Sequence, residues 1–399
     1  MKIYNSKYGQ VYRSDCLEVM KSLPDNSIST MITDPPSGIS FMGNSWDRNK
    51  GGRRQWVEYM AERFQEAKRI VKPGGLAIVW ALPRTSHWIA TALEDAGWYI
   101  DTKLYHLFGC GWPKSLDISK GIDKHFGCEK SDLAKKWNGY KIQMKPMCEE
   151  WIVCRKPVDK NYVNNALVHG VAGYNIDGCR IETNEIIKAN YRNSNTGIYG
   201  NFNNDGIKRE NNKGRYPGNV IVDGKVANEM DSRYGIDGAG RNDGSQKSEK
   251  GKMSDSEIFS GGKSRYFTRI NFQETDFFYG GKALSSEKNA GLEMLSEKEG
   301  NKGNPRRDGK NRGEIRMKNN HPTVKSLELC RWLCTLSKPP DGGTVLDIFA
   351  GSMSIPIAAY QTDRKFIAIE ESEDYCVIGI ARLKAAMEQK KFNFEKEKK

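Results

Sequence analysis

The sequence lacks any long apolar run. No segment of the 399 residues approaches the roughly 18 consecutive apolar residues of a membrane helix. The first ten residues, MKIYNSKYGQ, also lack the apolar stretch of a signal peptide. We therefore expect a cytoplasmic protein with no membrane partner.

Paired cysteines are absent as well. No Cys-x-x-Cys motif occurs, and although Cys330 and Cys334 lie four residues apart, neither has a Cys or His pair nearby to complete a tetrahedral site. We expect buried free thiols and no metal. The nine cysteines are Cys16, Cys110, Cys128, Cys148, Cys154, Cys179, Cys330, Cys334 and Cys376.

Acidic residues are outnumbered. The chain has 63 Lys and Arg against 50 Asp and Glu, a net charge of +13 and a pI near 9.1. Such an excess suits a polyanionic partner. The segment 301–320, NKGNPRRDGKNRGEIRMKNN, reads as a basic loop that lies along a phosphate backbone or is simply solvated. Its candidates for contact with double-stranded DNA are Arg306, Arg307, Lys310 and Arg312.

The stretch 28–37, ISTMITDPPS, is the most informative in the chain. Its apolar, β-branched run predicts a buried strand, and Pro35 and Pro36 end that strand with Asp34 at its tip. The prolines fix the direction of the backbone carbonyls beside the Asp34 carboxylate. Two such acceptors can hold both N–H groups of one amino group, as carried by adenine and cytosine.

Both ends of the chain alternate strand and helix patterns, which predicts one α/β sheet built from both ends. The middle, 184–262, is rich in Gly, Asn and Ser and predicts long loops with short strands such as 219–223. We expect helices at 16–23, 55–71, 87–96, 321–337, 355–361 and 375–391, and strands at 76–80, 98–108, 151–154, 344–349 and 365–369.

The segment 344–352, TVLDIFAGS, places a strand directly before a turn of small residues and a helix start. That geometry lets backbone approach a nucleotide-like ligand at the carboxyl end of a strand. The next strand ends at Glu370, whose carboxylate can hold two ribose hydroxyls. The binding candidates here are Asp347, Phe349, Ala350, Gly351, Ser352 and Glu370.

These segments together resemble the amino-DNA methyltransferases. Asp34-Pro35-Pro36-Ser37 resembles their Asp-Pro-Pro-Tyr motif, and the 344–352 turn resembles their Phe-x-Gly-x-Gly motif. His321-Pro-Thr-Val-Lys325 and Ser14-Asp15-Cys16 resemble two further segments of the family. The resemblance implies S-adenosyl-L-methionine as cofactor. It adds Asp15, Cys16, Asp34, His321, Thr323 and Lys325 to the cofactor residues, and Asp34, Pro35, Pro36 and Ser37 as catalytic residues. Asp15 is alternatively, or also, the N-cap of the helix that follows it.

The catalytic motif precedes the cofactor motif, an order typical of the circularly permuted β class of bacterial and phage enzymes. The resemblance implies a Rossmann-like methyltransferase sheet with catalytic (1–165) and cofactor-binding (319–399) halves flanking a target-recognition insert (166–318). It also implies a role in restriction–modification and makes a homodimer a candidate assembly. The lack of a Pro-Cys pair agrees with direct transfer rather than covalent attack.

Two residues depart from the family pattern. Ser37 replaces the Tyr that stacks on the flipped base, so we expect Phe41 or Trp46 to supply the ring, unless both are ordinary loop anchors. Met353 replaces the second glycine of the cofactor turn, and we expect its side chain to crowd the methionine end of the cofactor unless the turn is shifted.

Three functions remain open from the sequence. The first is an active DNA methyltransferase, with adenine N6 preferred over cytosine N4 because the motif begins with Asp. The second is a catalytically weak DNA-binding or cofactor-binding relative, suggested by Ser37 and Met353. The third is a methyltransferase that acts on RNA or another amine.

Overall fold

The computed structural model describes residues 1–48, 50–109, 115–129, 131–182, 187–189, 209–211, 213–234, 263–270, 283, 285–299 and 316–397. The predicted DNA-backbone candidates Arg306, Arg307, Lys310 and Arg312 lie outside these residues, as does Cys110.

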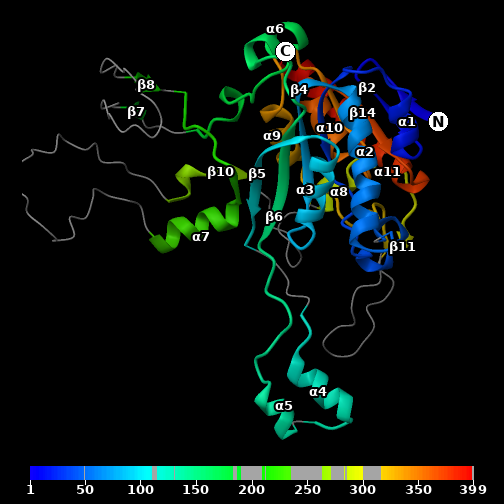
Figure 1. Ribbon diagram of the computed structural model, residues 1–399, viewed down its shortest axis with the longest axis vertical. Helices are drawn as coiled ribbons and strands as arrows, with labels where there is room; N and C mark the ends of the chain where they lie inside the picture. The colour runs from blue at the N-terminus through cyan, green and yellow to red at the C-terminus, as the bar shows by residue number, and fades with distance from the viewer. Residues whose placement is uncertain are drawn as a thin grey trace, which may run out of the picture.

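One large mixed sheet forms the centre of the molecule (Figure 1). Its ten described strands, in spatial order, are β1 (Lys2–Asn5), β2 (Gly9–Arg13), β14 (Lys365–Glu370), β13 (Thr344–Asp347), β3 (Ile28–Thr33), β4 (Val71–Ala81), β6 (Cys148–Arg155), β5 (Tyr99–Leu107), β9 (Val220–Asp223) and β10 (Thr268–Ile270). Two short pairs stand apart: β7 (Ile187–Ala189) with β8 (Arg209–Asn211), and β11 (Lys298–Glu299) with β12 (Arg316–Met317). The predicted α/β sheet built from both chain ends is confirmed.

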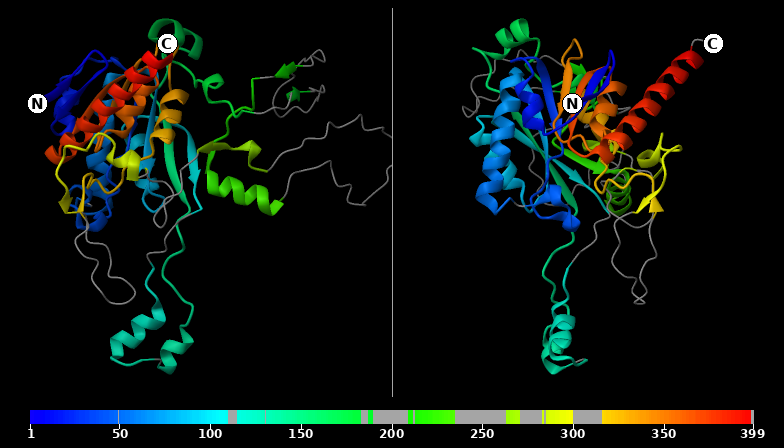
Figure 2. Two further views of the ribbon diagram at one scale, coloured as in Figure 1. Left: turned by 180° about the vertical axis from the view of Figure 1, so that it is seen from behind. Right: turned by 90° about the vertical axis from the view of Figure 1, so that its right-hand side faces the viewer.

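Helices cover both faces of this sheet, and the blue and the orange-red helices lie on opposite sides of it (Figure 2). One face carries α1 (Cys16–Lys21), α2 (Arg53–Ile70) and α3 (Ser86–Asp95), and the other carries α9 (Leu327–Leu336), α10 (Ser354–Gln361) and α11 (Glu373–Glu397). The remaining described α-helices are α4 (Ile118–Phe126), α5 (Asp132–Lys136), α6 (Tyr162–His169), α7 (Gly224–Tyr234) and α8 (Ser285–Asn289).

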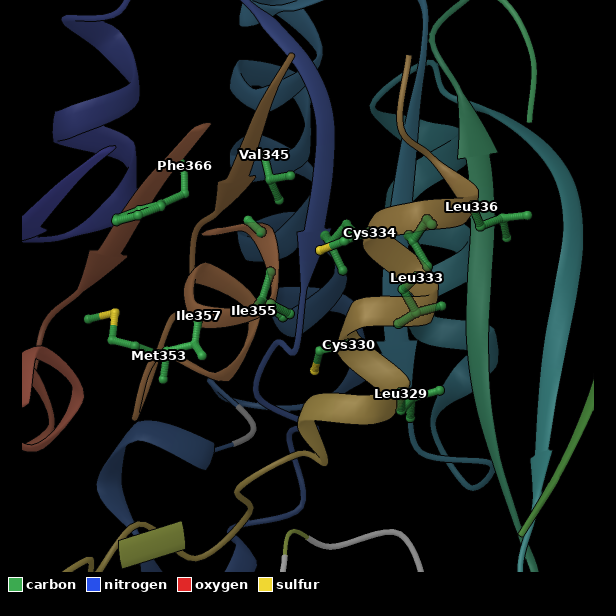
Figure 3. Packing of buried hydrophobic residues seen from close by; sticks show 14 of the residues in the cluster. Leu329, Cys330, Leu333, Cys334, Leu336, Val345, Met353, Ile355, Ile357 and Phe366 are labelled. Carbon is green, nitrogen blue, oxygen red and sulfur yellow. The ribbon is translucent and has the colours of Figure 1, made fainter. Parts of the chain in front are cut away.

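Strand β3 is buried along its whole length because helices pack on both of its faces. Its side chains alternate: Met31 packs with the α2 layer, and Ile32 packs with the α9 and α10 layer. Figure 3 shows the second layer, where Leu333 of α9 and Ile357 of α10 lie among the buried side chains. The continuous apolar run of β3 therefore marks it as a central strand.

The five strands β2, β14, β13, β3 and β4 run parallel, so their carboxyl ends meet at one edge. The chain leaves β13 toward β14 and leaves β3 toward β4, in opposite directions across the sheet. Neighbouring β13 and β3 thus form a topological switch point, where open α/β sheets leave a crevice for ligands. Asp347 and Asp34 stand at this point.

Most predicted elements are present with shifted ends, and one prediction is wrong. A helix was expected over 321–337, but α9 begins at Leu327, with the Ser326 hydroxyl accepting from the Leu329 N–H. Residues 321–325 are therefore not helical, and this places His321 and Lys325 at the edge of the sheet instead of along a helix.

The α4–α5 pair lies apart from the central sheet, whereas the β9–β10 part of the chain continues it. The separation of α4 and α5 from the sheet is seen in both figures (Figures 1 and 2). In the Gly- and Asn-rich middle, β9, α7 and β10 form a β-α-β unit that continues the central sheet, with β9 on the predicted strand 219–223.

Candidate active site

One cavity of about 1280 Å³ lies at the carboxyl ends of the parallel strands. It brings together all the candidates that fall in the described residues, although they come from both ends of the chain. These are Asp15, Cys16, Asp34, Pro35, Pro36, Ser37, Phe41, Trp46, His321, Thr323, Lys325, Asp347, Phe349, Ala350, Gly351, Ser352 and Glu370. The connection from the α4–α5 pair also reaches this cavity through Gln143 and Met144.

Asp34 lies at the tip of β3 and forms an ion pair with Lys325, whose Nζ is 3.1 Å from Asp34 Oδ2. Burial raises the pKa of Asp34 to about 6, and the Lys325 ammonium limits that rise. Asp34 is thus ionised at neutral pH but close enough to its pKa to accept a proton. The sequence did not predict this ion pair, because it assigned Lys325 to the cofactor.

Lys325 is held by more than Asp34. Its Nζ lies 3.8 Å from the ring centroid of Trp80, at the end of β4, and the Trp80 indole N–H donates to Glu149 Oε2 at 2.9 Å. Trp80 and Glu149 meet because β4 and β6 pair antiparallel. Neither residue was singled out from the sequence. The signal available was the position of Trp80 at the end of a strand next to the Asp34 strand.

The loop after Asp34 is organised around Asp47, which is completely buried. Its carboxylate accepts from the backbone N–H groups of Ser37, Gly38 (2.8 Å) and Phe41 (2.7 Å). The Ser37 hydroxyl donates to the same carboxylate at 3.2 Å. Asp47 therefore fixes the path of the loop that carries Phe41 and Trp46, and sequence reasoning missed it.

The turn after β13 is fastened to the end of β14. Glu370 accepts from the Gly351 N–H at 2.8 Å with one carboxylate oxygen and from the Ser372 N–H at 2.8 Å with the other. Each carboxylate oxygen keeps a second lone pair for a ligand hydroxyl. Gly351 has φ +49° and lies against His321, whose Nε2 would be 2.5 Å from a Cβ at this position. Only glycine fits there without displacing His321.

Asp347 is buried at the end of β13, and burial raises its pKa to about 8. Its Oδ1 accepts from the Thr33 hydroxyl at 2.8 Å and from the Phe349 N–H at 3.3 Å. Asp347 is therefore largely protonated at neutral pH, and it ties β13 to β3 beside Asp34.

Met353 does not crowd the cavity, and the expectation that it would is wrong. The residue keeps the left-handed conformation of a glycine, with φ +66°, while its side chain is fully buried in the core behind the turn (Figure 3). It packs against Gly379 of α11, where a Cβ would lie 2.3 Å from Met353 Cγ. The glycine in α11 provides the space that the Met353 side chain occupies.

Asp15 is the N-cap of α1, as expected. Its Oδ1 accepts from the Leu17 N–H at 2.8 Å, and its other oxygen lies 2.9 Å from the Arg63 guanidinium. The neighbouring thiol of Cys16 lines the cavity, but burial raises its pKa to about 12. A thiol whose pKa is raised by burial is a weaker nucleophile than an exposed one.

Within the part of the chain that the structure describes, no three His, Cys, Asp or Glu side chains are grouped as metal ligands. The same residues contain no helix that is both long and apolar enough to cross a membrane.

Comparison with known proteins identifies the family. The family model for the N6/N4 DNA methylases, described as DNA methylase, matches residues 28–381. The chain belongs to this family. The resemblance found in the sequence is thereby confirmed, and so is S-adenosyl-L-methionine as the cofactor of the family.

Individual relatives match shorter parts of this family member. A type II methyltransferase from Bacillus amyloliquefaciens, M.BamHI, is 26% identical over 162 residues, covering 35% of this chain and 37% of the relative. The Escherichia coli DNA adenine methyltransferase YhdJ is 42% identical over 67 residues, covering 17% of this chain and 22% of the relative. The chain thus spans about a fifth to just over a third of these relatives. Among solved structures, the match to the PvuII cytosine-N4-specific DNA methyltransferase covers 95% of this chain and 87% of the PvuII chain, at 14% identity and a TM-score of 0.48.

Proposed function

We propose that this protein transfers a methyl group from S-adenosylmethionine to the exocyclic amine of a base flipped out of double-stranded DNA, with adenine N6 as the acceptor. The observation that carries the proposal is the Asp34 carboxylate at the tip of β3, in one cavity with the turn that follows β13. The Asp34 carboxylate, which can accept hydrogen bonds from the amine, and the cofactor turn follow adjacent strands. This arrangement brings the base and the cofactor together.

The residues of the cavity suit this cofactor. Glu370 retains acceptor capacity for two hydroxyls, and the glycine turn at Gly351 allows close backbone approach. Met353 leaves the cavity open, because its side chain lies in the core. When bound, S-adenosylmethionine supplies an electrophilic methyl group on a sulfonium.

Asp34 makes the amine nucleophilic. An aromatic amine is a poor nucleophile because its lone pair is delocalised into the ring. Hydrogen bonds from its two N–H groups to the Asp34 carboxylate and the Pro35 carbonyl favour a tetrahedral nitrogen with a localised lone pair. That nitrogen gains the methyl group and loses one proton. Asp34, with a pKa of about 6, is placed to accept the proton.

Adenine is the preferred base for two reasons. The catalytic motif begins with Asp34, whereas the cytosine-N4 members it resembles often begin with Ser. YhdJ, with 42% identity over its matched segment, is named a DNA adenine methyltransferase. Cytosine N4 is the alternative acceptor within the same mechanism.

Phe41 is the better candidate for stacking on the flipped base. Its backbone N–H is fixed by Asp47, while Trp46 lies beside Tyr375, whose ring packs against His321 on the cofactor side of the cavity. Phe41→Ala is then expected to lower turnover on DNA more than Trp46→Ala does. Equal and negligible effects of both changes would remove both residues from base binding.

We also propose that 166–318 contains the target-recognition region between the halves 1–165 and 319–399, and that Arg306, Arg307, Lys310 and Arg312 contact DNA phosphates. Each lost phosphate contact reduces the slope of log affinity against log salt by about one, because one counterion fewer is released on binding. Replacing the four residues by alanine is expected to flatten the plot of log affinity against log salt. An unchanged slope would contradict their role.

Transfer of tritiated methyl groups to genomic DNA and, in a parallel reaction, to total RNA, followed by separation of the nucleosides, tests the function. Tritium in N6-methyladenine is the expected result, and tritium in N4-methylcytosine would change the base. Label in RNA alone would contradict the substrate. Tight cofactor binding with no label in any nucleic acid would show a binding relative rather than an enzyme.

A further inference from the structure

We infer that Lys325 reads the ring nitrogen next to the target amine, so that Asp34 and Lys325 together select a base with a donor and an acceptor side by side. This inference rests on the proposed function and deepens it. It assigns Lys325 to base selection instead of the cofactor.

The ion pair presents a hydrogen-bond acceptor and a donor in the order that such a base requires. Adenine presents its N6 amino donor beside the N1 acceptor, and cytosine presents its N4 amino donor beside the N3 acceptor. Guanine and thymine present the reverse order, an oxygen acceptor beside a ring N–H donor. The Asp34 carboxylate is an acceptor, and the Lys325 ammonium, 3.1 Å from Asp34 Oδ2, is a donor. The pair therefore matches the N6 and N1 edge of adenine and the N4 and N3 edge of cytosine, and it opposes the oxygen and ring N–H of guanine and thymine.

Lys325 is positioned firmly enough to act in this way. Its side chain is 8% exposed, with the ammonium on the face of Trp80 at 3.8 Å. The Glu149 carboxylate fixes the Trp80 ring by accepting its indole N–H at 2.9 Å. An ammonium has three N–H donors, so one carboxylate oxygen and one aromatic face leave a donor for a ligand in the cavity that Lys325 lines.

Lys325 remains charged at neutral pH. Burial acts to lower its pKa, but the carboxylates of Asp34 and Glu149 outweigh burial, and the pKa is raised. A charged donor to a ring nitrogen makes a charge-assisted hydrogen bond, which is about twice as strong as a neutral one. Losing that bond is expected to cost about 10- to 100-fold in kcat/KM.

A simpler role for Lys325 would be to stabilise the Asp34 carboxylate without touching the base. The two roles differ in one respect. Only direct contact makes the effect of changing Lys325 depend on the presence of the ring nitrogen.

The test combines enzyme variants with base analogues in an unmethylated duplex that carries the recognition sequence, which is first mapped by sequencing genomic DNA that the enzyme has methylated. The target adenine is replaced by 1-deazaadenine, which lacks N1, or by 3-deazaadenine as the matched control, since N3 is remote from the amine. The wild-type enzyme is expected to lose about 10- to 100-fold in kcat/KM on 1-deazaadenine and much less on 3-deazaadenine. If cytosine is the methylated base, 3-deazacytosine takes the place of 1-deazaadenine.

The enzyme variants are Lys325→Met, which removes the donors, and Lys325→Arg, which keeps charge and donors. Lys325→Met is expected to lose at least a similar factor on adenine, because it also removes the ion pair with Asp34, and to show no further loss on 1-deazaadenine, with cofactor affinity unchanged. Lys325→Arg should recover part of the activity. Losses that multiply in Lys325→Met, or no loss by the wild-type enzyme on 1-deazaadenine, would overturn the inference while the proposed function stands. If no base is methylated at all, both fall.

Discussion

Each of the two turns of the active site has one residue that departs from the family pattern, and the two turns accommodate it differently. The catalytic turn after β3 has Ser37 where the family has Tyr, and the cofactor turn after β13 has Met353 where it has Gly. Met353 keeps the glycine conformation and places its side chain in the core against Gly379, so the cavity wall is preserved. Ser37 instead joins the polar network of Asp47.

The substitution in the cofactor turn changes the packing of the core, whereas the substitution in the catalytic turn changes a side chain of the site. The cofactor turn is held by the hydrogen bond from the Gly351 N–H to the half-buried Glu370 carboxylate and by the core behind the turn, so a substitution can be absorbed where a neighbour gives space. The catalytic turn is held by hydrogen bonds to the buried Asp47 carboxylate, while Ser37 lines the cavity, so replacing Tyr by Ser changes a side chain that the substrate meets. The three variants below test these two halves of the comparison.

Asp47→Asn is expected to have the largest effect, and to act mainly on the catalytic side. The variant puts an NH₂ group against backbone donors and loses the charge that the Ser37, Gly38 and Phe41 N–H groups bind. We expect a loss of about 2–3 kcal/mol in the free energy of unfolding by urea and a much lower turnover. The affinity for the cofactor should stay close to that of the wild type. Asp132→Asn, on the exposed helix α5, is the control and should change neither. A cofactor affinity that falls as much as turnover would contradict the separation.

Gly379→Ala tests the cofactor side. The new methyl group overlaps Met353 and should cost about 1–3 kcal/mol in stability, with weaker cofactor binding measured by calorimetry. Met353→Ala in the same chain should restore much of both, since it removes the clashing atoms. If the two changes simply add, Met353 is not what Gly379 accommodates.

Asp347→Asn is expected to be stabilising, unlike the two variants above, and the gain should depend on pH. Burial raises the pKa of Asp347 from 3.8 to about 8, so its contribution to stability is present at low pH and is lost as the pH rises from about 4 to about 8. Asparagine keeps the acceptor for Thr33 and Phe349 but has no charge to bury. Relative to the wild type, the variant should gain about 3–4 kcal/mol more at pH 8 than at pH 5 in thermal unfolding. An equal difference at both pH values would show that Asp347 does not titrate in this range.

The sequence predicted features that are set by neighbours in the chain. The apolar run before Asp34, the small-residue turn at Gly351 and the cap at Asp15 are local patterns, and each is found in the structure. The convergence of these residues followed from the rule that parallel strands end at one edge.

Features set by contacts across the chain were missed. The Lys325 and Asp34 pair joins residues from opposite ends of the sequence, and the Trp80 and Glu149 contact depends on the antiparallel pairing of β4 with β6. The mistaken prediction for Met353 has the same origin. A family motif gives the backbone conformation of the turn, but the side chain went where Gly379, on a later helix, left room.

Single-turnover methyl transfer by Asp34→Ala, with cofactor already bound, tests the central claim most directly. Calorimetry on the same protein establishes that the cofactor still binds. The account predicts cofactor affinity close to that of the wild type and a rate of transfer to DNA that is at least about 100- to 1000-fold lower. Transfer at the wild-type rate would contradict the assignment of Asp34 as the acceptor that activates the amine.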